Sequence, residues 1–200
     1  MTVYVISFFD NKQSRYDSFR KLIETFLKLN VKIVVLWMNH EHQKILHPDI
    51  SYINSEKTNA SVARNKLLKL FYSSDQHEAI FSDDDVQILN VNILNEPFDN
   101  YDVITFLSNI SHRPHRYYFF ASTLFKIQQH KEIYFDESLE ANQDLDFGYN
   151  CFFNGVKIKE VYTKDVYNDK ENSVMFKDEN DRKKKKKEAF HKINQKYGTT

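Results

Sequence analysis

Residues 78–86, Glu-Ala-Ile-Phe-Ser-Asp-Asp-Asp-Val, decide how this chain is understood. The apolar run from Glu78 to Phe81 predicts a short buried strand, so the carboxylates of Asp83, Asp84 and Asp85 should emerge at its C-terminal end. Mg²⁺ and Mn²⁺ prefer carboxylate and water oxygens, and ligands of open α/β sheets bind outside the carboxyl ends of the strands. The three acids therefore predict a metal site that serves a phosphorylated ligand. The alternative is a solvated acidic turn.

Composition points to one soluble domain. The chain has 200 residues, of which 41% are hydrophobic and 15% aromatic, enough for a sizeable core. Only three Gly and three Pro argue against a disordered chain. The lone Cys151 rules out an intramolecular disulfide and a cysteine-rich zinc cluster, which fits a reducing compartment. Because no apolar run approaches about 20 residues and the N-terminus lacks a signal peptide's basic start, we expect no membrane partner and a cytoplasmic location, in the host cytoplasm if the protein is viral.

Strand and helix patterns alternate along the first half of the chain. Ser14 is a candidate N-cap for a first helix. A second helix is predicted at 59–72, with Val62, Leu67, Leu70 and Phe71 on its inner side. This alternation predicts an α/β fold, with a mainly parallel sheet flanked by helices. The predicted strands lie at 2–9, 31–38, 50–53, 78–81 and 101–107.

The second half contains a further acidic helix start. Residues 117–125 are aromatic and predict a strand that runs into a short helix, and 143–153 predict a helix. Asp144 and Asp146 are two apart on that helix, so their side chains should point in different directions. The helix dipole favours an ionised Asp144 in the first turn, and a carboxylate beside a metal–phosphate site suits a general base. A structural helix cap is the alternative interpretation.

The C-terminal segment is basic. Residues 181–200 carry a net charge of +6, which leaves −6 on residues 1–180. The run from Lys183 to Lys187 predicts a solvated helix face or a polyanion-binding face. The helical spacing of Phe190, Ile193 and Tyr197 predicts that this helix docks on the rest of the chain.

Two histidine-containing features have open interpretations. The segment from His112 to Arg116 is a basic loop, either solvated or binding a phosphate. His191 on the C-terminal helix is either a surface histidine or a further metal ligand.

Five short motifs follow one another along the chain: Asn59–Asn65, Phe81–Asp85, Phe135–Glu137, Gln143–Phe147 and Asn154–Ile158. In this order they resemble the GT-A-fold nucleotide-sugar glycosyltransferases, specifically the family-2-like inverting group, over roughly residues 1–162. The resemblance implies a GT-A (Rossmann-like) domain at 1–162, followed at 163–200 by an extension whose Lys-rich helix packs on the same domain.

The resemblance assigns the acidic triplet to the family's DxD motif. It implies that Asp83 and Asp85 serve Mn²⁺ or Mg²⁺, with Asp85 binding the ion that bridges the donor diphosphate. Asp83 would help hold the ribose or the metal's water shell. Asp84 would either take part in donor binding or be merely exposed. Arg64 would lie near the nucleotide, where a guanidinium binds phosphate oxygens or stacks on the base.

The family's Glu-Asp motif falls on Gln143 and Asp144, with Gln143 in place of the usual Glu. The resemblance implies that Asp144 is the catalytic base of an inverting single displacement, a hexosyl or pentosyl transfer. The family often has an acidic turn near the nucleobase where this chain has Asn39, which is able to hydrogen-bond the base. Family habit favours a uridine diphosphate sugar as donor.

The acceptor and two rival classes stay open. Family-2-like enzymes act on lipid-linked sugars, polysaccharides, proteins and, in some bacteriophages, hydroxymethylated cytosine in DNA. The basic loop and the lysine run make hydroxymethylated or glycosylated cytosine in DNA one candidate acceptor, reached by base flipping; a soluble or surface glycan is the other. A Mg²⁺-dependent nucleotidyltransferase usually has an early Gly-rich loop, yet residues 1–147 contain no glycine. A non-catalytic nucleotide-sugar binding module is the other rival, and the oligomeric state is not encoded in these motifs.

Overall fold

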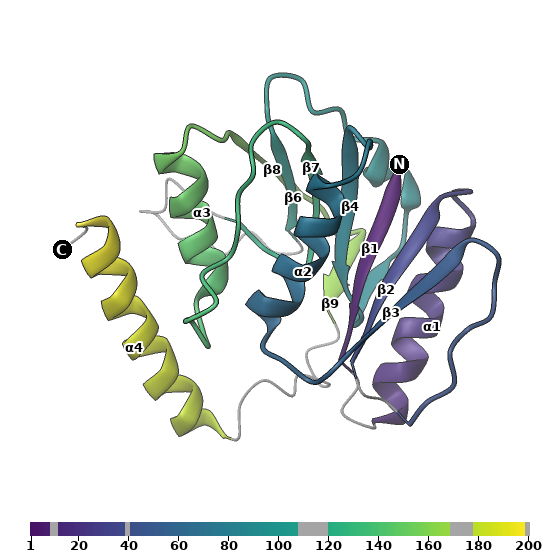
Figure 1. Ribbon diagram of the computed structural model, residues 1–200, viewed down its shortest axis with the longest axis horizontal. Coiled ribbons are helices and arrows are strands. Elements are labelled where there is room, and N and C mark those ends of the chain that lie inside the picture. The colour runs from purple at the N-terminus through teal and green to yellow at the C-terminus, as the bar shows by residue number, and fades with distance from the viewer. Residues whose placement is uncertain (9–11, 39–40, 108–119, 169–177, 199–200) are drawn as a thin grey trace.

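The computed structural model describes residues 1–8, 12–38, 41–107, 120–168 and 178–198. Within these residues, seven strands form a central sheet with helices on both faces, and two short strands pair separately (Figure 1). The central strands are β1 (Thr2–Ser7), β2 (Lys32–Met38), β3 (Ile50–Ser55), β4 (Glu78–Asp83), β6 (Val103–Leu107), β7 (Leu124–Gln128) and β8 (Ile158–Tyr162). The remaining elements are α1 (Gln13–Leu27), α2 (Ala60–Tyr72), β5 (Val86–Ile88), the 3₁₀ helix η1 (Val91–Asn95), α3 (Gln143–Phe153), β9 (Val166–Asn168) and α4 (Glu179–Tyr197).

Strand order places the acidic triplet at a shared edge of the sheet. The order is β3-β2-β1-β4-β7-β6-β8, and the first four strands are mutually parallel. β7 runs antiparallel to both its neighbours, and its first residue, Leu124, pairs with Ser82. The carboxyl end of β4 therefore lies beside the start of β7, which brings residues just before β7 to the same edge.

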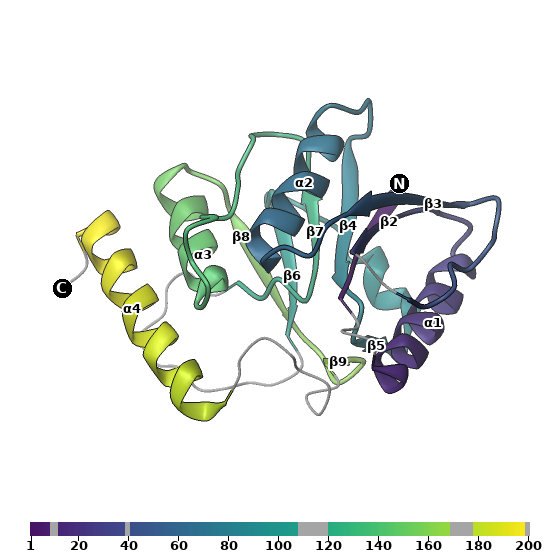
Figure 2. The ribbon, with the colours of Figure 1, turned by 60° about the horizontal axis from the view of Figure 1, so that its bottom comes forward.

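The core has two layers, one on each face of the sheet. On one face, the α1 side chains Phe19, Ile23 and Phe26 pack on alternate strand residues such as Val5. On the other face, α2 and α3 cover the intervening strand residues (Figure 2). Since successive strand residues point to opposite faces, this accounts for the almost uninterrupted apolar sequence of β1 and β2.

The structure confirms the alternating α/β fold and most predicted elements. The helix predicted at 143–153 has those same bounds, and Phe147 and Cys151 are both fully buried on it. Within residues 120–128, however, the chain forms only the strand β7 and no helix, whereas residues 117–119 lie outside the described ranges. Phe125 stacks on Phe81 of β4 at 5.0 Å between ring centroids, so pairing with β4 sets the conformation there.

Two expectations about helix ends and faces were wrong. α1 has Lys12 as its N-cap, so Ser14 lies inside the first turn, where its carbonyl accepts from Ser18 Oγ. On α2, Leu70 is 41% exposed and Leu68 is buried, because the inner face follows Leu67, Leu68 and Phe71.

The C-terminal basic helix packs on α3 (Figures 1 and 2). Ala189 and Ile193 are buried against Leu139 and Ala141, with Tyr197 partly buried beside them. Phe190 is 48% exposed, so the expectation that it docks was wrong: the docked face follows a spacing of four residues, which Phe190 does not share.

The boundary at residue 162 stays a prediction. The strand β9 lies beyond that residue, yet it pairs with β5, directly after the acidic triplet. Among the described residues, no helix has the length and hydropathy that crossing a bilayer requires.

Candidate functional site

The three acids at the end of β4 turn in different directions and find different partners. Asp83, the last residue of the strand, faces α2, where Arg64 pairs with it. Asp84 turns inward to α1 and is fully buried. Asp85 is 8% exposed and lies beside the same α1 arginine. The alternative of a solvated acidic turn, with Asp84 merely exposed, was therefore wrong.

Arg64 holds Asp83 through a single nitrogen. Its Nη2 donates to both carboxylate oxygens, at 2.8 Å each. Its guanidinium also lies over the Phe135 ring, 5.4 Å from the centroid. Arg64 is 5% exposed, and its Nε and Nη1 have no hydrogen-bond partner in the described part of the chain. Two buried donors are thus left for a ligand acceptor such as a phosphate or ribose oxygen.

Arg15 of α1 holds the other two carboxylates. It donates to Asp84 Oδ1 from Nε at 2.8 Å and from Nη2 at 2.7 Å, and the Phe8 N–H donates to Asp84 Oδ2. The Arg15 Nη2 atom also lies 3.4 Å from Asp85 Oδ2. Arg15 points inward because it falls on the buried face of α1, four residues before Phe19.

The pKa values of Asp84, Asp85 and Arg15 are all shifted, and the two carboxyl groups differ in their hydrogen-bond donors. Burial raises the pKa of Asp84 and of Asp85, that of Asp85 to about 7, while the Arg15 guanidinium opposes both rises. Burial would lower the pKa of Arg15, but Asp84 and Asp85 outweigh it and raise that pKa. Three N–H donors on one carboxylate favour its ionised form. We therefore assign the ion pair with Arg15 to Asp84, and the protonatable carboxyl to Asp85.

Asp144 approaches Asp83 from the first turn of α3. It is partly buried beside Ser122, which precedes β7 and hydrogen-bonds to its carboxylate. Burial raises the pKa of Asp144; the Arg64 charge and the Ser122 hydrogen bond oppose the rise, and Asp83 adds to it. Next to these residues, Arg64, Ser82, Asp83 and Ser122 border a packing gap that is too small for a water molecule and that the Phe81 and Phe125 rings also line.

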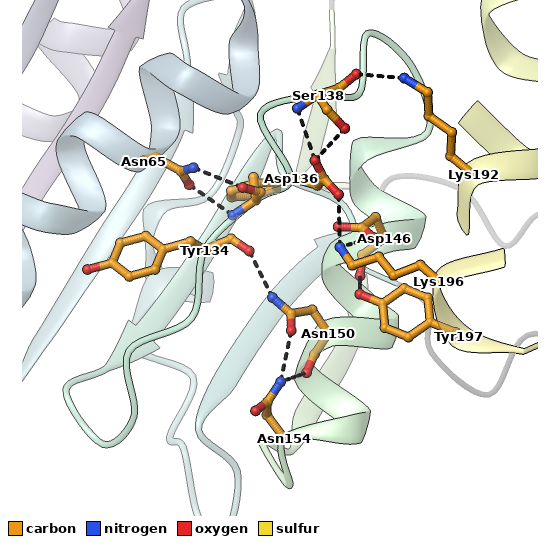
Figure 3. Close-up of polar contacts among 11 residues, drawn as sticks. Asn65, Tyr134, Asp136, Ser138, Asp146, Asn150, Asn154, Lys192, Lys196 and Tyr197 are labelled. Carbon is orange, nitrogen blue, oxygen red and sulfur yellow. Dashed lines mark hydrogen bonds and ion pairs between the residues drawn. The ribbon is translucent and has the colours of Figure 1, made fainter. Parts of the chain in front are cut away.

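Asp146 points away from Asp144, toward α4, as the two-residue spacing predicted. Its Oδ1 accepts from Lys196 Nζ at 2.8 Å, and its backbone carbonyl accepts from the Tyr197 hydroxyl at 3.3 Å (Figure 3). Lys196 also donates to Asp136 Oδ2 at 3.0 Å. Burial alone would lower the pKa of Lys196, but hydrogen bonds to the two carboxylates raise it well above its ordinary value.

Asn65, next to Arg64 on α2, ties down the segment before α3. Its amide accepts from the Phe135 N–H and donates to the Phe135 carbonyl, both at 2.9 Å. It also donates to Glu137 Oε1 at 2.9 Å. Figure 3 shows how this anchor and the Lys196 bridge lie on either side of Asp136.

The donor set fits a hard divalent cation. Asp85 Oδ1 is buried and has no hydrogen-bond partner within the described residues, although a carboxylate oxygen in that position needs one. Mg²⁺ and Mn²⁺ accept such oxygens and complete their shell with water and phosphate oxygens. Across the described ranges, no group of three or more His, Cys, Asp or Glu side chains is arranged to hold a metal ion.

The structure thus brings Asp83, Arg64 and Asp144 together, with Asp85 close by. Their roles as metal, nucleotide and base residues stay predictions, as does donor binding by Asp84, whose carboxylate is occupied by Arg15. Asn39 and the segment from His112 to Arg116 lie outside the described residues. His191 is exposed and hydrogen-bonds to Gln195 at 2.9 Å between their Nε2 atoms.

Sequence reasoning missed Arg15, Ser122, Asn65 and Lys196. The position of Arg15 could have indicated its role, because it interrupts the apolar face of α1 and a buried arginine needs a buried carboxylate as its partner. No sequence pattern indicates the roles of Ser122 and Lys196, because their partners depend on the placement of strand β7 and on the docking of α4.

Comparisons with known proteins define the fold. No family model matches the sequence, and no curated protein is significantly similar to it. The mannosyltransferase PcManGT from Pyrobaculum calidifontis, solved with GDP-Man and Mn²⁺, superposes with a TM-score of 0.56 at 13% identity. The match covers 82% of this chain and 55% of that one. A putative nucleotide-diphospho-sugar transferase from Desulfovibrio desulfuricans G20 gives a TM-score of 0.58 at 6% identity, over 80% of this chain and 79% of that one.

The catalytic domain of Drosophila β1,4-galactosyltransferase 7, solved with xylobiose, gives a TM-score of 0.50 at 14% identity. That match covers 80% of this chain and 63% of the other. The chain has the GT-A fold. It spans only 55% of the mannosyltransferase and 63% of the galactosyltransferase domain.

Proposed function

We propose that this chain is a metal-dependent glycosyltransferase that moves a sugar from a nucleoside diphosphate sugar to an acceptor hydroxyl. One observation carries the proposal: Arg64, Asp83 and Asp144 converge at the carboxyl edge of a GT-A sheet, and Asp85 adds a buried unpaired carboxylate oxygen there. Ligands of open α/β sheets bind at this edge. The fold and the site therefore support the same reaction class.

The donor would lie across the end of β4. Arg64 has two unpaired donors for the diphosphate or ribose, while its Nη2 keeps Asp83 oriented. Asp83 and Asp85 would hold Mn²⁺ or Mg²⁺ against the diphosphate. When bound, the ion supplies Lewis-acid stabilisation of the departing diphosphate. PcManGT, which shares the fold, was solved with GDP-Man and Mn²⁺, and our sequence-based expectation for this chain is a UDP-sugar.

Asp144 is the proposed base of an inverting single displacement. It would take the proton of the acceptor hydroxyl as that oxygen bonds to the anomeric carbon. The bond between the anomeric carbon and the diphosphate oxygen breaks, and its electron pair leaves with the nucleoside diphosphate. Burial raises the pKa of Asp144, which makes it a stronger base than a solvated aspartate once it is ionised.

A glycan hydroxyl is the acceptor we favour. The Drosophila enzyme with the same fold was solved with xylobiose. Modified cytosine in DNA is a second candidate because of one observation on α4. Lys183, Lys184 and Lys187 are exposed and make no ion pair within the described residues, whereas Lys185 and Lys196 pair with carboxylates. An unpaired lysine face suits a polyanion.

The decisive experiment is a thermal shift panel of UDP, GDP and their sugars, with and without Mn²⁺. The proposal predicts that one nucleotide raises the melting temperature only when metal is present. Asp85→Asn should lose that metal-dependent shift, while Asp75→Asn, which changes an exposed aspartate, should keep it. No shift with any nucleotide would overturn the proposal.

Turnover separates the rival classes. Release of nucleoside diphosphate from the stabilising donor supports the transferase. Stabilisation without release identifies a non-catalytic binding module, and release of pyrophosphate from a nucleoside triphosphate and a sugar phosphate identifies a nucleotidyltransferase.

The DNA acceptor has its own test. Fluorescence anisotropy with duplex DNA should show affinity that falls steeply with salt and that Lys183→Glu/Lys184→Glu/Lys187→Glu removes. A matched charge change on exposed lysines elsewhere, Lys21→Glu/Lys28→Glu/Lys164→Glu, should leave it in place. Absence of salt-sensitive affinity in the unchanged protein eliminates DNA.

A further inference from the structure

The last turn of α4 joins two segments that both lead to the proposed base. Lys196 Nζ donates to Asp136 Oδ2 at 3.0 Å in the loop before α3, and to Asp146 Oδ1 at 2.8 Å in the first turn of α3 (Figure 3). The next residue, Tyr197, donates to the Asp146 carbonyl at 3.3 Å. Its ring stacks on those of Tyr149 and Phe153, each with 5.2 Å between centroids.

Holding Asp146 fixes the direction of Asp144. On an α-helix, side chains two positions apart differ by about 200° in direction, so a contact that fixes Asp146 also sets the direction of Asp144. Asp146 is fully buried against α4, whereas Asp144 faces Ser122 and Arg64 on the opposite side. The N-cap, Asn142, makes no side-chain capping bond, so the usual support for a first turn is missing here.

The same bridge is anchored to the nucleotide side of the site. Asp136 lies between Phe135 and Glu137, and Asn65 of α2 makes three hydrogen bonds to those two residues. Asn65 is adjacent to Arg64. A continuous series of contacts therefore runs from α2 through the loop at 135–137 and Lys196 to the first turn of α3.

We propose that Lys196 is a positioning residue that sets Asp144 against Arg64 and Asp83, so that the C-terminal helix completes the active site. The inference rests on the proposed function. Among the lysines of α4, it assigns the ordering of the site to Lys196 and not to the exposed lysines near the start of the helix.

Three variants at Lys196 and one control separate positioning from folding. Lys196→Met leaves Asp146 buried without its cation, so it is expected to unfold readily. Lys196→Met/Asp146→Asn removes both charges and should refold, but it still lacks the bridge to Asp136. Lys196→Arg restores a cation able to reach both carboxylates. Lys192→Met is the matched control, because Lys192 lies on the same helix and its one recorded hydrogen bond within the described part of the chain is to the Ser138 carbonyl, at 3.3 Å.

The first readout is turnover of the donor that the unchanged chain accepts. The double variant should lose about tenfold to a hundredfold in kcat, the range that a misplaced catalytic group costs, with KM for the donor unchanged. Lys196→Arg should recover most of kcat, and Lys192→Met should match the unchanged chain. A folded double variant with normal kcat overturns the inference.

The second readout needs no substrate. Backbone amides 143–147 should exchange with deuterium faster in the double variant than in the unchanged chain, while those of α2 keep their rates. Equal exchange at 143–147 also overturns the inference. Failure of the proposed function gives a different result: the unchanged chain then releases no nucleoside diphosphate from any donor. The exchange experiment still decides in that case whether Lys196 orders the first turn of α3.

Discussion

Arg64 binds Asp83 with one nitrogen and keeps two others unused. Nη2 lies 2.8 Å from each carboxylate oxygen, and the buried Nε and Nη1 have no partner within the described residues. A guanidinium committed to Asp83 alone would more commonly present a two-nitrogen fork. The geometry fits a side chain that orients Asp83 through Nη2 and leaves Nε and Nη1 able to donate to a ligand.

Arg64→Lys should therefore weaken nucleotide binding without unfolding the chain. Lysine keeps a positive charge near Asp83 but lacks the extra planar donors. Because hydrogen bonds to charged groups are worth about 1.5–3 kcal/mol, affinity for the stabilising nucleotide with Mn²⁺ should fall about tenfold or more. Isothermal titration calorimetry measures it, with Lys69→Met on the same helix as the control. Unchanged affinity would remove Arg64 from the donor site.

Arg15 should matter for stability more than any arginine on the surface. Its side chain is 9% exposed and that of Asp84 only 1%. Arg15→Met leaves a buried carboxylate unpaired, which should cost about 3–5 kcal/mol in the free energy of unfolding. Urea denaturation at neutral pH tests this. Arg15→Met/Asp84→Asn should recover most of the loss, because Asp84 then carries no unpaired charge and only the 3.4 Å contact of Asp85 with Arg15 is still missing.

Arg20→Met is the matched control for Arg15. Arg20 lies on the exposed side of α1, so its replacement should stay within about 0.5 kcal/mol. Equal losses for the two arginines would mean that the pair with Asp84 adds nothing.

Asp144 should carry a pH-dependent penalty that its replacement removes. Its pKa is raised in the folded chain, mainly by burial, so folding favours the protonated carboxyl. Stability then falls as pH rises from the unfolded pKa, about 3.9, through the folded value. Asp144→Asn should melt at nearly the same temperature as the unchanged chain below about pH 4 and higher at neutral pH, while turnover is lost and donor binding remains.

Differential scanning calorimetry from pH 3.5 to 7.5 measures the difference in melting temperature between the two chains. A penalty of 1 kcal/mol corresponds to about 2–4 °C for a chain of this size. If Asp144→Asn melts lower at neutral pH and also loses donor binding, Asp144 has a structural role instead of the role of a base.

Much of the fold was readable because its signals are local. Apolar runs gave the strands, and the helix at 143–153 was predicted with its observed bounds because Phe147 and Cys151 mark its inner face. The position of the acids at the end of β4 followed from the run that precedes them. The Asp144–Asp146 divergence followed from helix geometry alone.

The partners of those acids could not be predicted from the sequence, because they depend on contacts between segments that are far apart in the chain. Arg15 lies 69 residues before Asp84, and nothing local pairs them. The antiparallel insertion of β7, which brings Ser122 to Asp144, is a property of the sheet order. The docked face of α4 was misassigned because the spacing of Phe190 and Ile193 also fits one face of a helix, whereas the residue buried with Ile193 is Ala189, four positions before it.

That last difference can be tested with two substitutions on one helix. Ile193 is fully buried against α3, so Ile193→Ala should cost about 2–4 kcal/mol, the usual loss for emptying a buried aliphatic site. Phe190 is larger but 48% exposed, so Phe190→Ala should change the free energy of unfolding by under about 1 kcal/mol. Urea denaturation compares the two variants, and hydrogen exchange along 179–197 shows whether α4 alone loosens. If Phe190→Ala proved the more costly change, the helix would have to dock through the face that the hydrophobic spacing of the sequence first suggested.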